Sequence, residues 1–174
     1  PSAGKTASDA KRALLNFASP TDKVQHFYSD NAPELKKAGD EMGWRHDAST
    51  PGVSQTNAVA ERQIRRVEEG TRTALYQAGA HHSMWPLAAQ HFCMATNLTT
   101  VNGSSAWRAR HKCDFRGQDV PFGALIDFKP PLSLTTRRKF PKFGPNGVPG
   151  LFLGWHMRPG GKWGGEYLVG LLKD

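Results

Sequence analysis

One long amphipathic pattern, at residues 57–79, most constrains how this chain can fold. Small and apolar residues recur there at the three- and four-residue spacing of a single helical face. Asn57 can cap this helix and Gly79 can end it. A second helix follows over 84–98, with Pro86 in its first turn. We therefore expect two adjacent helices that pack against a preceding strand. The predicted buried stripe of the first helix comprises Ala60, Ile64, Val67, Thr71, Ala74, Leu75 and Ala78.

The residues ahead of these helices combine helical and β-prone segments. The alternating run at 23–29 is rich in β-forming residues and predicts a strand. Helices are predicted on either side of it, over 8–19 and 33–43, the first capped by Ser8 or Asp9. A brief strand at 44–47 and a loop over 48–56 complete this part of the chain. The pattern indicates an α/β fold class.

The character of the sequence changes after residue 98, where Gly and Pro become frequent and the apolar periodicity shortens. Three segments have the composition of strands, at 120–128, 150–157 and 166–172. A basic, proline-rich connector at 129–147 joins the first two. We therefore predict a small β-rich appendage after the α/β part, with the boundary within 99–118.

Composition and charge limit the classes of partner. The chain has 174 residues and is 38% hydrophobic, enough for a core and too apolar for a disordered tail. Lys and Arg outnumber Asp and Glu by 23 to 15, a net charge of +8. This surplus favours nucleic acid as a partner, or else it is a solvated basic surface. No run is long and apolar enough to span a membrane, and two cysteines fit reduced thiols inside a cell.

Two carboxylates form the first candidate site. Asp30 follows the predicted strand 23–29, and Glu61 lies in the first turns of the predicted helix 57–79. Carboxylates at a junction of sheet and helix can bind Mg²⁺ or Mn²⁺, which prefer oxygen ligands. The structural alternatives are a turn at Asp30 and a helical ion pair between Glu61 and Arg65.

Two further groups of side chains can bind ligands. A zinc site is suggested by two pairs, His91 with Cys93 and His111 with Cys113. Residues two apart on a helix point to different sides, so no zinc is expected. Cys93 is instead predicted to pack inside its helix. Basic side chains can neutralise DNA phosphates, or simply line a solvated face. This predicted DNA-binding set comprises Arg62, Arg65, Arg66, Arg108, Arg110, Lys112, Arg137, Arg138 and Lys139.

Several motifs resemble one known family. "YSDNAPE" at 28–34 resembles the "SDNGGE" block of copia-type retrotransposon integrases, which are cut from a Pol polyprotein. "STPGVSQTNAVAER" at 49–62 is similar to that family's "STPYTPQQNGVAER". "PFGA" at 121–124 and "LFLGW" at 151–155 resemble its later "FGC" and "FLGY" motifs. The likeness runs over about residues 8–172 in the family's order.

The resemblance implies a partial RNase H-like integrase core over 8–98, a connector over 99–118 and a β-rich C-terminal region over 119–174. It implies that Asp30 and Glu61 are the second and third catalytic acids, which hold Mg²⁺ or Mn²⁺ for strand transfer of DNA. The family's first catalytic Asp sits on an earlier strand.

Neither Asp9, at a helix start, nor Asp22, in a turn, fits the role of that first acid. We therefore expect the first Asp upstream of this chain, and no integration activity from this chain alone. Ala32-Pro33 and Ala58 replace glycines of the family motifs.

The implied partners are DNA and other integrase chains or a larger assembly, inside the cell and in the nucleus for an active element. The alternative is an element-derived interaction or structural subunit without catalysis, in which a partner covers the exposed strand edge and apolar helix faces.

Overall fold

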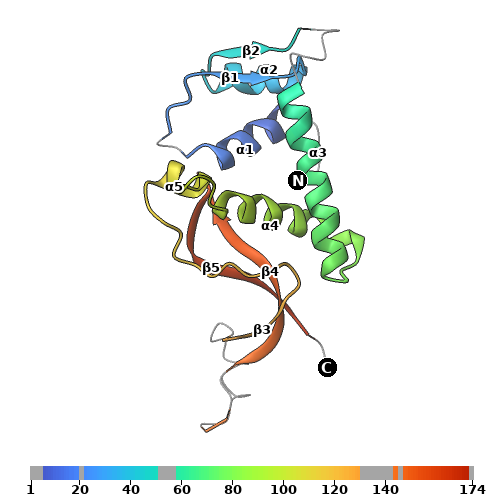
Figure 1. Cartoon of the computed structure of the whole chain (residues 1–174). Helices are drawn as coiled ribbons and strands as arrows, with labels where there is room; N and C mark the ends of the chain where they lie inside the picture. Colours follow the sequence, from blue (N-terminus) through green and yellow to red (C-terminus); the bar gives the residue numbers. More distant parts are fainter. Residues whose placement is uncertain (1–5, 20–21, 51–57, 130–142, 145–146, 173–174) are drawn as a thin grey trace. The chain divides into compact units, whose positions relative to one another are not determined.

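The computed structural model describes residues 6–19, 22–50, 58–129, 143–144 and 147–172. It combines helices and strands, which is consistent with the predicted α/β class (Figure 1). The elements are α1 (Ala7–Phe17), β1 (Phe27–Ser29), α2 (Pro33–Glu41), β2 (His46–Ala48), α3 (Ala58–Gln77), the 3₁₀ helix η2 (His82–Met84), α4 (Trp85–Leu98), α5 (Ala106–His111), β3 (Leu125–Phe128), β4 (Val148–Arg158) and β5 (Lys162–Leu171).

The chain divides into two compact units. Unit 1 comprises Pro1–Val67 and His156–Gly164, and unit 2 comprises Glu68–Trp155 and Gly165–Asp174. The division falls inside α3, so this helix contributes its first half to unit 1 and its second half to unit 2. It also falls inside the β4–β5 hairpin, whose tip belongs to unit 1. The predicted division at 8–98, 99–118 and 119–174 remains a prediction.

Unit 1 is built on a β-α-β motif. β1 and β2 pair in parallel, with Phe27 opposite His46 and Ser29 opposite Ala48. Helix α2 connects them and packs closely on the pair, because a Cβ on the buried Gly39 would lie only 3.4 Å from the Phe27 ring. β1 begins at Phe27, so the predicted strand 23–29 is too long. Only its last three residues pair with β2, which is itself three residues long.

The N-cap of helix α1 lies two residues before Ser8, the first of its predicted caps. Thr6, and not Ser8 or Asp9, is the N-cap, and its hydroxyl oxygen accepts a hydrogen bond from the Asp9 backbone amide at 3.2 Å. Asp9 therefore occupies the third helical position, where an acid complements the helix dipole. Lys11 joins α1 to α2 through an ion pair with Glu41 at 3.1 Å.

The tip of the β4–β5 hairpin is part of unit 1 because it packs on the end of α1. The Gly160 backbone amide donates to the Asn16 carbonyl at 3.0 Å. Gly160 has φ +80°, and a Cβ added there would lie 2.7 Å from the Ser19 Cβ. The position therefore requires glycine both for its conformation and for the close approach to α1.

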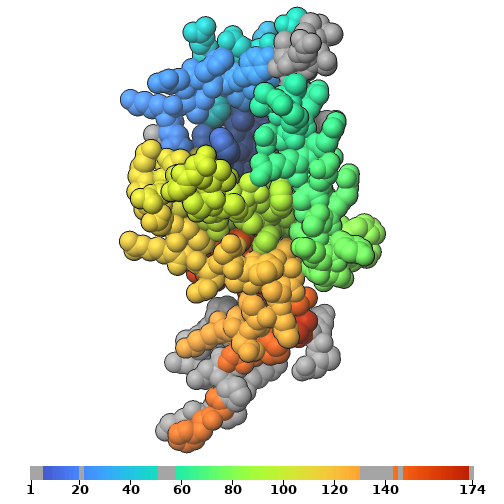
Figure 2. All heavy atoms as spheres, in the orientation of Figure 1, coloured from blue at the N-terminus to red at the C-terminus, as the bar shows by residue number. Residues whose placement is uncertain are grey.

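Helix α3 matches its predicted bounds closely but buries only part of the predicted stripe. Thr71 is buried, whereas Ile64 remains 59% exposed. Atoms of α3 are visible on the surface in Figure 2. The helix ends at Gln77, and Gly79 follows with φ +58°. The Ala80 amide donates to the Leu75 carbonyl, which completes a glycine-terminated C-cap. The predicted cap Asn57 lies outside the described residues.

An aromatic core holds unit 2 together. Helix α4 buries Ala88, His91 and Met94. The His91 ring stacks on Trp155 of β4, with ring centroids 5.0 Å apart. Phe152, which is 1% exposed, packs edge-on against both rings. A helix face and a strand face therefore meet over aromatic side chains.

The three-stranded sheet of the C-terminal part has the order β3-β4-β5, and β3 is antiparallel to β4. The predicted strand 120–128 is wrong in its first half, because residues 121–124 form a turn. The Ala124 amide donates to the Pro121 carbonyl, and Gly123 has φ +75°. Two further hydrogen bonds join this turn to β4, from Gly123 N to Phe152 O at 2.7 Å and from Phe152 N to Ala124 O at 2.9 Å.

The predicted connector 99–118 contains the short helix α5. The hydroxyl of Ser105 caps it by accepting from the Arg108 amide at 3.1 Å. Trp107 is buried, and its ring packs edge-on against Phe115 at 5.0 Å between centroids. Phe115 in turn packs edge-on against Trp155 of β4, with ring centroids 6.2 Å apart, which joins the segment to the aromatic core of unit 2. Among the described residues, no helix is both long enough and apolar enough to cross a membrane.

Candidate functional site

Asp30 lies at the carboxyl end of β1, directly after the last paired residue. Its side chain is exposed to solvent. β1 and β2 are parallel, so the carboxyl ends of both strands lie at the same edge, where the Ser49 amide donates to the Ser29 carbonyl at 2.9 Å. This edge is where open parallel sheets commonly present ligand-binding groups.

The backbone at Asp30 is held by its neighbours in the sheet. The Ser29 hydroxyl donates to the Asp30 carbonyl oxygen at 2.7 Å. The same hydroxyl oxygen lies 2.9 Å from His46 Nε2 on β2. Because the hydroxyl proton already points at Asp30, His46 donates its Nε2 proton to Ser29 in this arrangement. A chain of two hydrogen bonds therefore fixes the peptide unit that carries the candidate carboxylate.

Glu61 lies in the first turn of α3 and is exposed. Within the described residues it forms no ion pair with Arg65, although a neighbouring pair on the same helix, Arg72 and Glu68, approaches to 3.9 Å. The predicted alternative of a helical ion pair at Glu61 is therefore wrong. Its carboxylate faces solvent and retains its oxygens for another ligand.

Asp30 and Glu61 belong to the same compact unit. No third potential metal ligand accompanies them in the described part of the chain. That part contains no group of three or more His, Cys, Asp or Glu side chains placed to hold a metal ion. Two exposed carboxylates have the oxygen chemistry that Mg²⁺ and Mn²⁺ prefer. They supply fewer protein ligands than a complete two-metal site uses.

The predicted DNA-binding side chains fall on two separate elements. Arg62, Arg65 and Arg66 are exposed on the first half of α3, in unit 1. Three more are exposed at α5 in unit 2: Arg108, Arg110 and Lys112. The last three, Arg137, Arg138 and Lys139, lie outside the described residues.

Helix α5 orients the predicted DNA-binding side chains in this region differently. Arg108 and Arg110 are two apart on a helix and therefore project to different sides. Arg108 also lies 3.5 Å from the Asp114 carboxylate, which offsets part of its charge. Lys112 ends the helix in the left-handed conformation, with φ +58°.

The structure gives His91 and Cys93 different surroundings. His91 is buried, and its Nε2 donates to the Val120 carbonyl at 2.8 Å. Cys93 is exposed, so the prediction that it packs inside the helix is wrong. Neighbouring protein atoms nevertheless desolvate the thiol, which raises the pKa of Cys93 above its ordinary value. Cys113 is also exposed.

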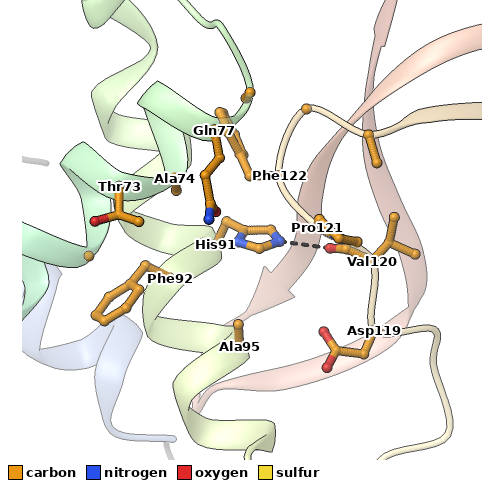
Figure 3. Close-up of a pocket in the computed structure, with 14 residues that line it drawn as sticks. Thr73, Ala74, Gln77, His91, Phe92, Ala95, Asp119, Val120, Pro121 and Phe122 are labelled. Atoms are coloured by element: carbon orange, nitrogen blue, oxygen red, sulfur yellow. Dashed lines mark hydrogen bonds between the residues drawn. The ribbon is translucent and has the colours of Figure 1, made fainter.

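A pocket of about 680 Å³ lies within unit 2, between α3, α4 and the turn that follows Val120 (Figure 3). The sequence patterns did not predict it, because its walls come from three segments distant in the chain. The Phe92 ring on α4, the Phe122 ring and the Pro121 ring contribute apolar walls. Thr73, Gln77, His91 and Asp119 supply the polar lining groups.

The comparisons with known proteins relate this chain to a retroelement. One segment is 34% identical over 80 residues to the "Retrovirus-related Pol polyprotein from transposon TNT 1-94" of Nicotiana tabacum. The chain is similar to part of a Pol polyprotein. The match covers 43% of this chain and only 6% of the length of that relative. No protein-family model matches the chain. The match supports a fragment derived from a retrotransposon Pol polyprotein.

Proposed function

We propose that this chain is a segment of a retrotransposon integrase and that Asp30 and Glu61 are two of its metal-binding catalytic carboxylates. The observation that carries the proposal is the position of Asp30, exposed at the carboxyl end of a parallel strand in the same unit as Glu61. The similarity to a Pol polyprotein and the motif at 28–34 support the same assignment. An RNase H-like arrangement of the first unit is part of this proposal.

The proposed reaction is DNA strand transfer, in which a 3′-hydroxyl of the element DNA attacks a target phosphate, and the bond from that phosphate to the 3′-oxygen of the adjoining target nucleotide breaks. Bound Mg²⁺ or Mn²⁺ would activate the hydroxyl and neutralise charge on the phosphate. Asp30 would bind the cation at a sheet edge, with its backbone fixed by Ser29 and His46. Glu61 would supply a second carboxylate from α3. A third carboxylate, which the described residues do not bring to these two, would come from another segment, so this chain should not integrate DNA by itself.

The arginines of α3 would hold DNA next to these carboxylates. Arg62, Arg65 and Arg66 follow Glu61 directly and are exposed. They would neutralise backbone phosphates without reading base sequence. Separately, Arg108, Arg110 and Lys112 at α5 are proposed phosphate contacts of unit 2. For an active element, the proposed strand transfer would take place in the nucleus.

A second candidate function is a non-catalytic interaction subunit. Large apolar side chains remain exposed on α3 close to Glu61: Val59 is 66% exposed and Ile64 is 59% exposed. Such side chains suit coverage by another chain. In this case the first half of α3 would bind protein, and Asp30 and Glu61 would not need to bind metal.

Metal binding distinguishes the two functions. Titration of Mn²⁺ into ¹⁵N-labelled chain should broaden the amide signals near both Asp30 and Glu61, because the ion relaxes nearby nuclei. Asp30→Asn and Glu61→Gln should each reduce this broadening at both positions. Asp40→Asn, an exposed carboxylate of α2 in the same unit, is the matched control. Broadening that is unchanged in Asp30→Asn would overturn the proposed role.

DNA binding is tested separately by its dependence on salt. The Arg62→Gln, Arg65→Gln, Arg66→Gln triple variant should weaken binding to any duplex and lower the salt slope by about one for each lost phosphate contact. Arg45→Gln removes one exposed arginine of unit 1 outside this set and should cause a smaller change. Binding that is insensitive to salt would favour the interaction subunit.

A further inference from the structure

The pocket of unit 2 is partly open to solvent and has closely packed walls. Phe92 packs directly on Gly70, because a Cβ there would overlap the phenyl ring. The turn that contains Gly123 approaches α3 equally closely, because a Cβ at Gly123 would overlap Ala78. Both contacts require glycine and bring the walls together. At about 680 Å³ the pocket has the size of a typical ligand site.

Polar groups enter this apolar pocket from all three walls. Gln77 projects from α3 with its carboxamide directed at the His91 ring, and the Asp119 carboxylate points toward Ala95 of α4 (Figure 3). Within the described residues, neither Gln77 nor Asp119 has a hydrogen-bond or ion-pair partner for its side chain. His91 already uses its Nε2 proton on Val120. Gln77 and Asp119 therefore remain as acceptors for a ligand.

The charge of the pocket is opposite to that of the whole chain. The chain carries +8, yet Asp119 is the charged carboxylate of the pocket, and no Lys or Arg lines it among the residues that the structure describes. A nucleic-acid phosphate would be repelled here. A cation would be attracted, and the apolar walls would cover its hydrocarbon part.

We propose that this pocket binds a protein segment that carries an arginine beside a large apolar residue. The planar guanidinium has five N–H donors and pairs well with a carboxylate such as that of Asp119, while the Gln77 carbonyl is a further acceptor in the pocket. The apolar neighbour would contact the walls formed by Phe92 and Phe122. The cavity is larger than one side chain needs, so it can take both residues.

Binding is measured with two short peptides and the ¹⁵N-labelled full chain. The probe is acetyl-Gly-Arg-Phe-Gly-amide, and the control peptide replaces its arginine with glutamine. The probe should shift the amide signals of Gln77, Gly123 and Ala124 in a saturable manner. The glutamine peptide should bind about tenfold more weakly, because it lacks the charge-assisted contact.

Variants of the protein test whether the arginine of the peptide contacts Asp119. Asp119→Asn should weaken binding of the arginine peptide about tenfold and leave binding of the glutamine peptide nearly unchanged. Asp127→Asn is the matched control, because Asp127 is also exposed in unit 2 but does not line the pocket. Ala95→Leu should weaken binding of both peptides by filling the cavity, with the amide spectrum of the free variant checked for an intact fold.

Four results would overturn the proposal. The first is equal binding of the two peptides, and the second is an equal effect of Asp119→Asn and Asp127→Asn. The third is a DNA duplex that shifts the same pocket amides as the arginine peptide, which would assign the pocket to nucleic acid. An absence of pocket shifts at millimolar peptide would also reject it.

Discussion

The two units present their chemical groups in opposite ways. In unit 1, Asp30 extends into solvent at the end of a strand of three residues, and backbone contacts from Ser29 and His46 hold it. In unit 2, aromatic rings surround His91, and a pocket lies beside it. The first arrangement leaves a carboxylate accessible to a large substrate. The second forms a partly open pocket suited to a side chain.

The motifs that resemble the integrase family do not all have the same structural role in this chain. The motif at 28–34 leaves a carboxylate accessible. The motifs at 121–124 and 151–155 bond to each other through the backbone of Gly123, Ala124 and Phe152. The latter two are parts of a single structural feature that supports a wall of the pocket.

The largest expected effect tests whether unit 2 depends on its aromatic core. Phe152→Ala should lower the free energy of unfolding by about 3–5 kcal/mol, because it leaves a cavity against His91 and Trp155. Chemical denaturation measures the loss, and Leu125→Ala, at a position that is 68% exposed, is the control. The amide signals of α4 should change more than those of α2. Equal changes in both would contradict the contrast between the units.

A smaller effect tests the contact between the β4–β5 hairpin and α1. Gly160→Ala adds a Cβ 2.7 Å from the Ser19 Cβ at a residue with φ +80°. Gly165→Ala has a similar φ of +91°, but a Cβ there meets nothing within 4 Å. Both variants strain the backbone, so the extra loss in Gly160→Ala should be about 1–3 kcal/mol from overpacking. Equal losses of unfolding free energy would show that the hairpin tip does not rest on α1.

The smallest effect concerns Cys93, an exposed residue beside the packed face of α4. Desolvation raises its pKa, so at a given pH less thiolate is present than in an unfolded chain. In a Cys113→Ser variant, the pH midpoint for alkylation of Cys93 should be higher in the folded protein than in guanidinium chloride. A midpoint that is equal or lower in the folded protein would show that unit 2 does not desolvate this surface.

Local signals in the sequence predicted the bounds of α3 and α4 well. Gly79 marks the end of α3, and Pro86 marks the start of α4. The backbone preferences of glycine and proline act within a few residues, so they can be recognised from the sequence. The strand 23–29 was predicted too long because its length depends on a partner, and β2 offers only three residues. Helix α5 was missed because burial of Trp107 depends on residues such as Phe115 in the folded chain.

The candidate site was predictable only in part. The sequence placed Asp30 after a strand and Glu61 at a helix start, and both positions are found in the structure. Their metal-binding role remains a prediction. The pocket had no sequence signal, because Gln77, His91 and Asp119 are brought together by tertiary packing alone.

The β4–β5 hairpin has a consequence for synthesis on the ribosome. Asn16 and Ser19 leave the exit tunnel early, whereas Gly160, which contacts both, is made long after them. The nascent chain therefore exposes this end of α1 while α3, α4 and α5 are translated. Chaperones can reach this end of α1 throughout that interval. The hairpin covers it only after residues 156–164 have emerged from the ribosome.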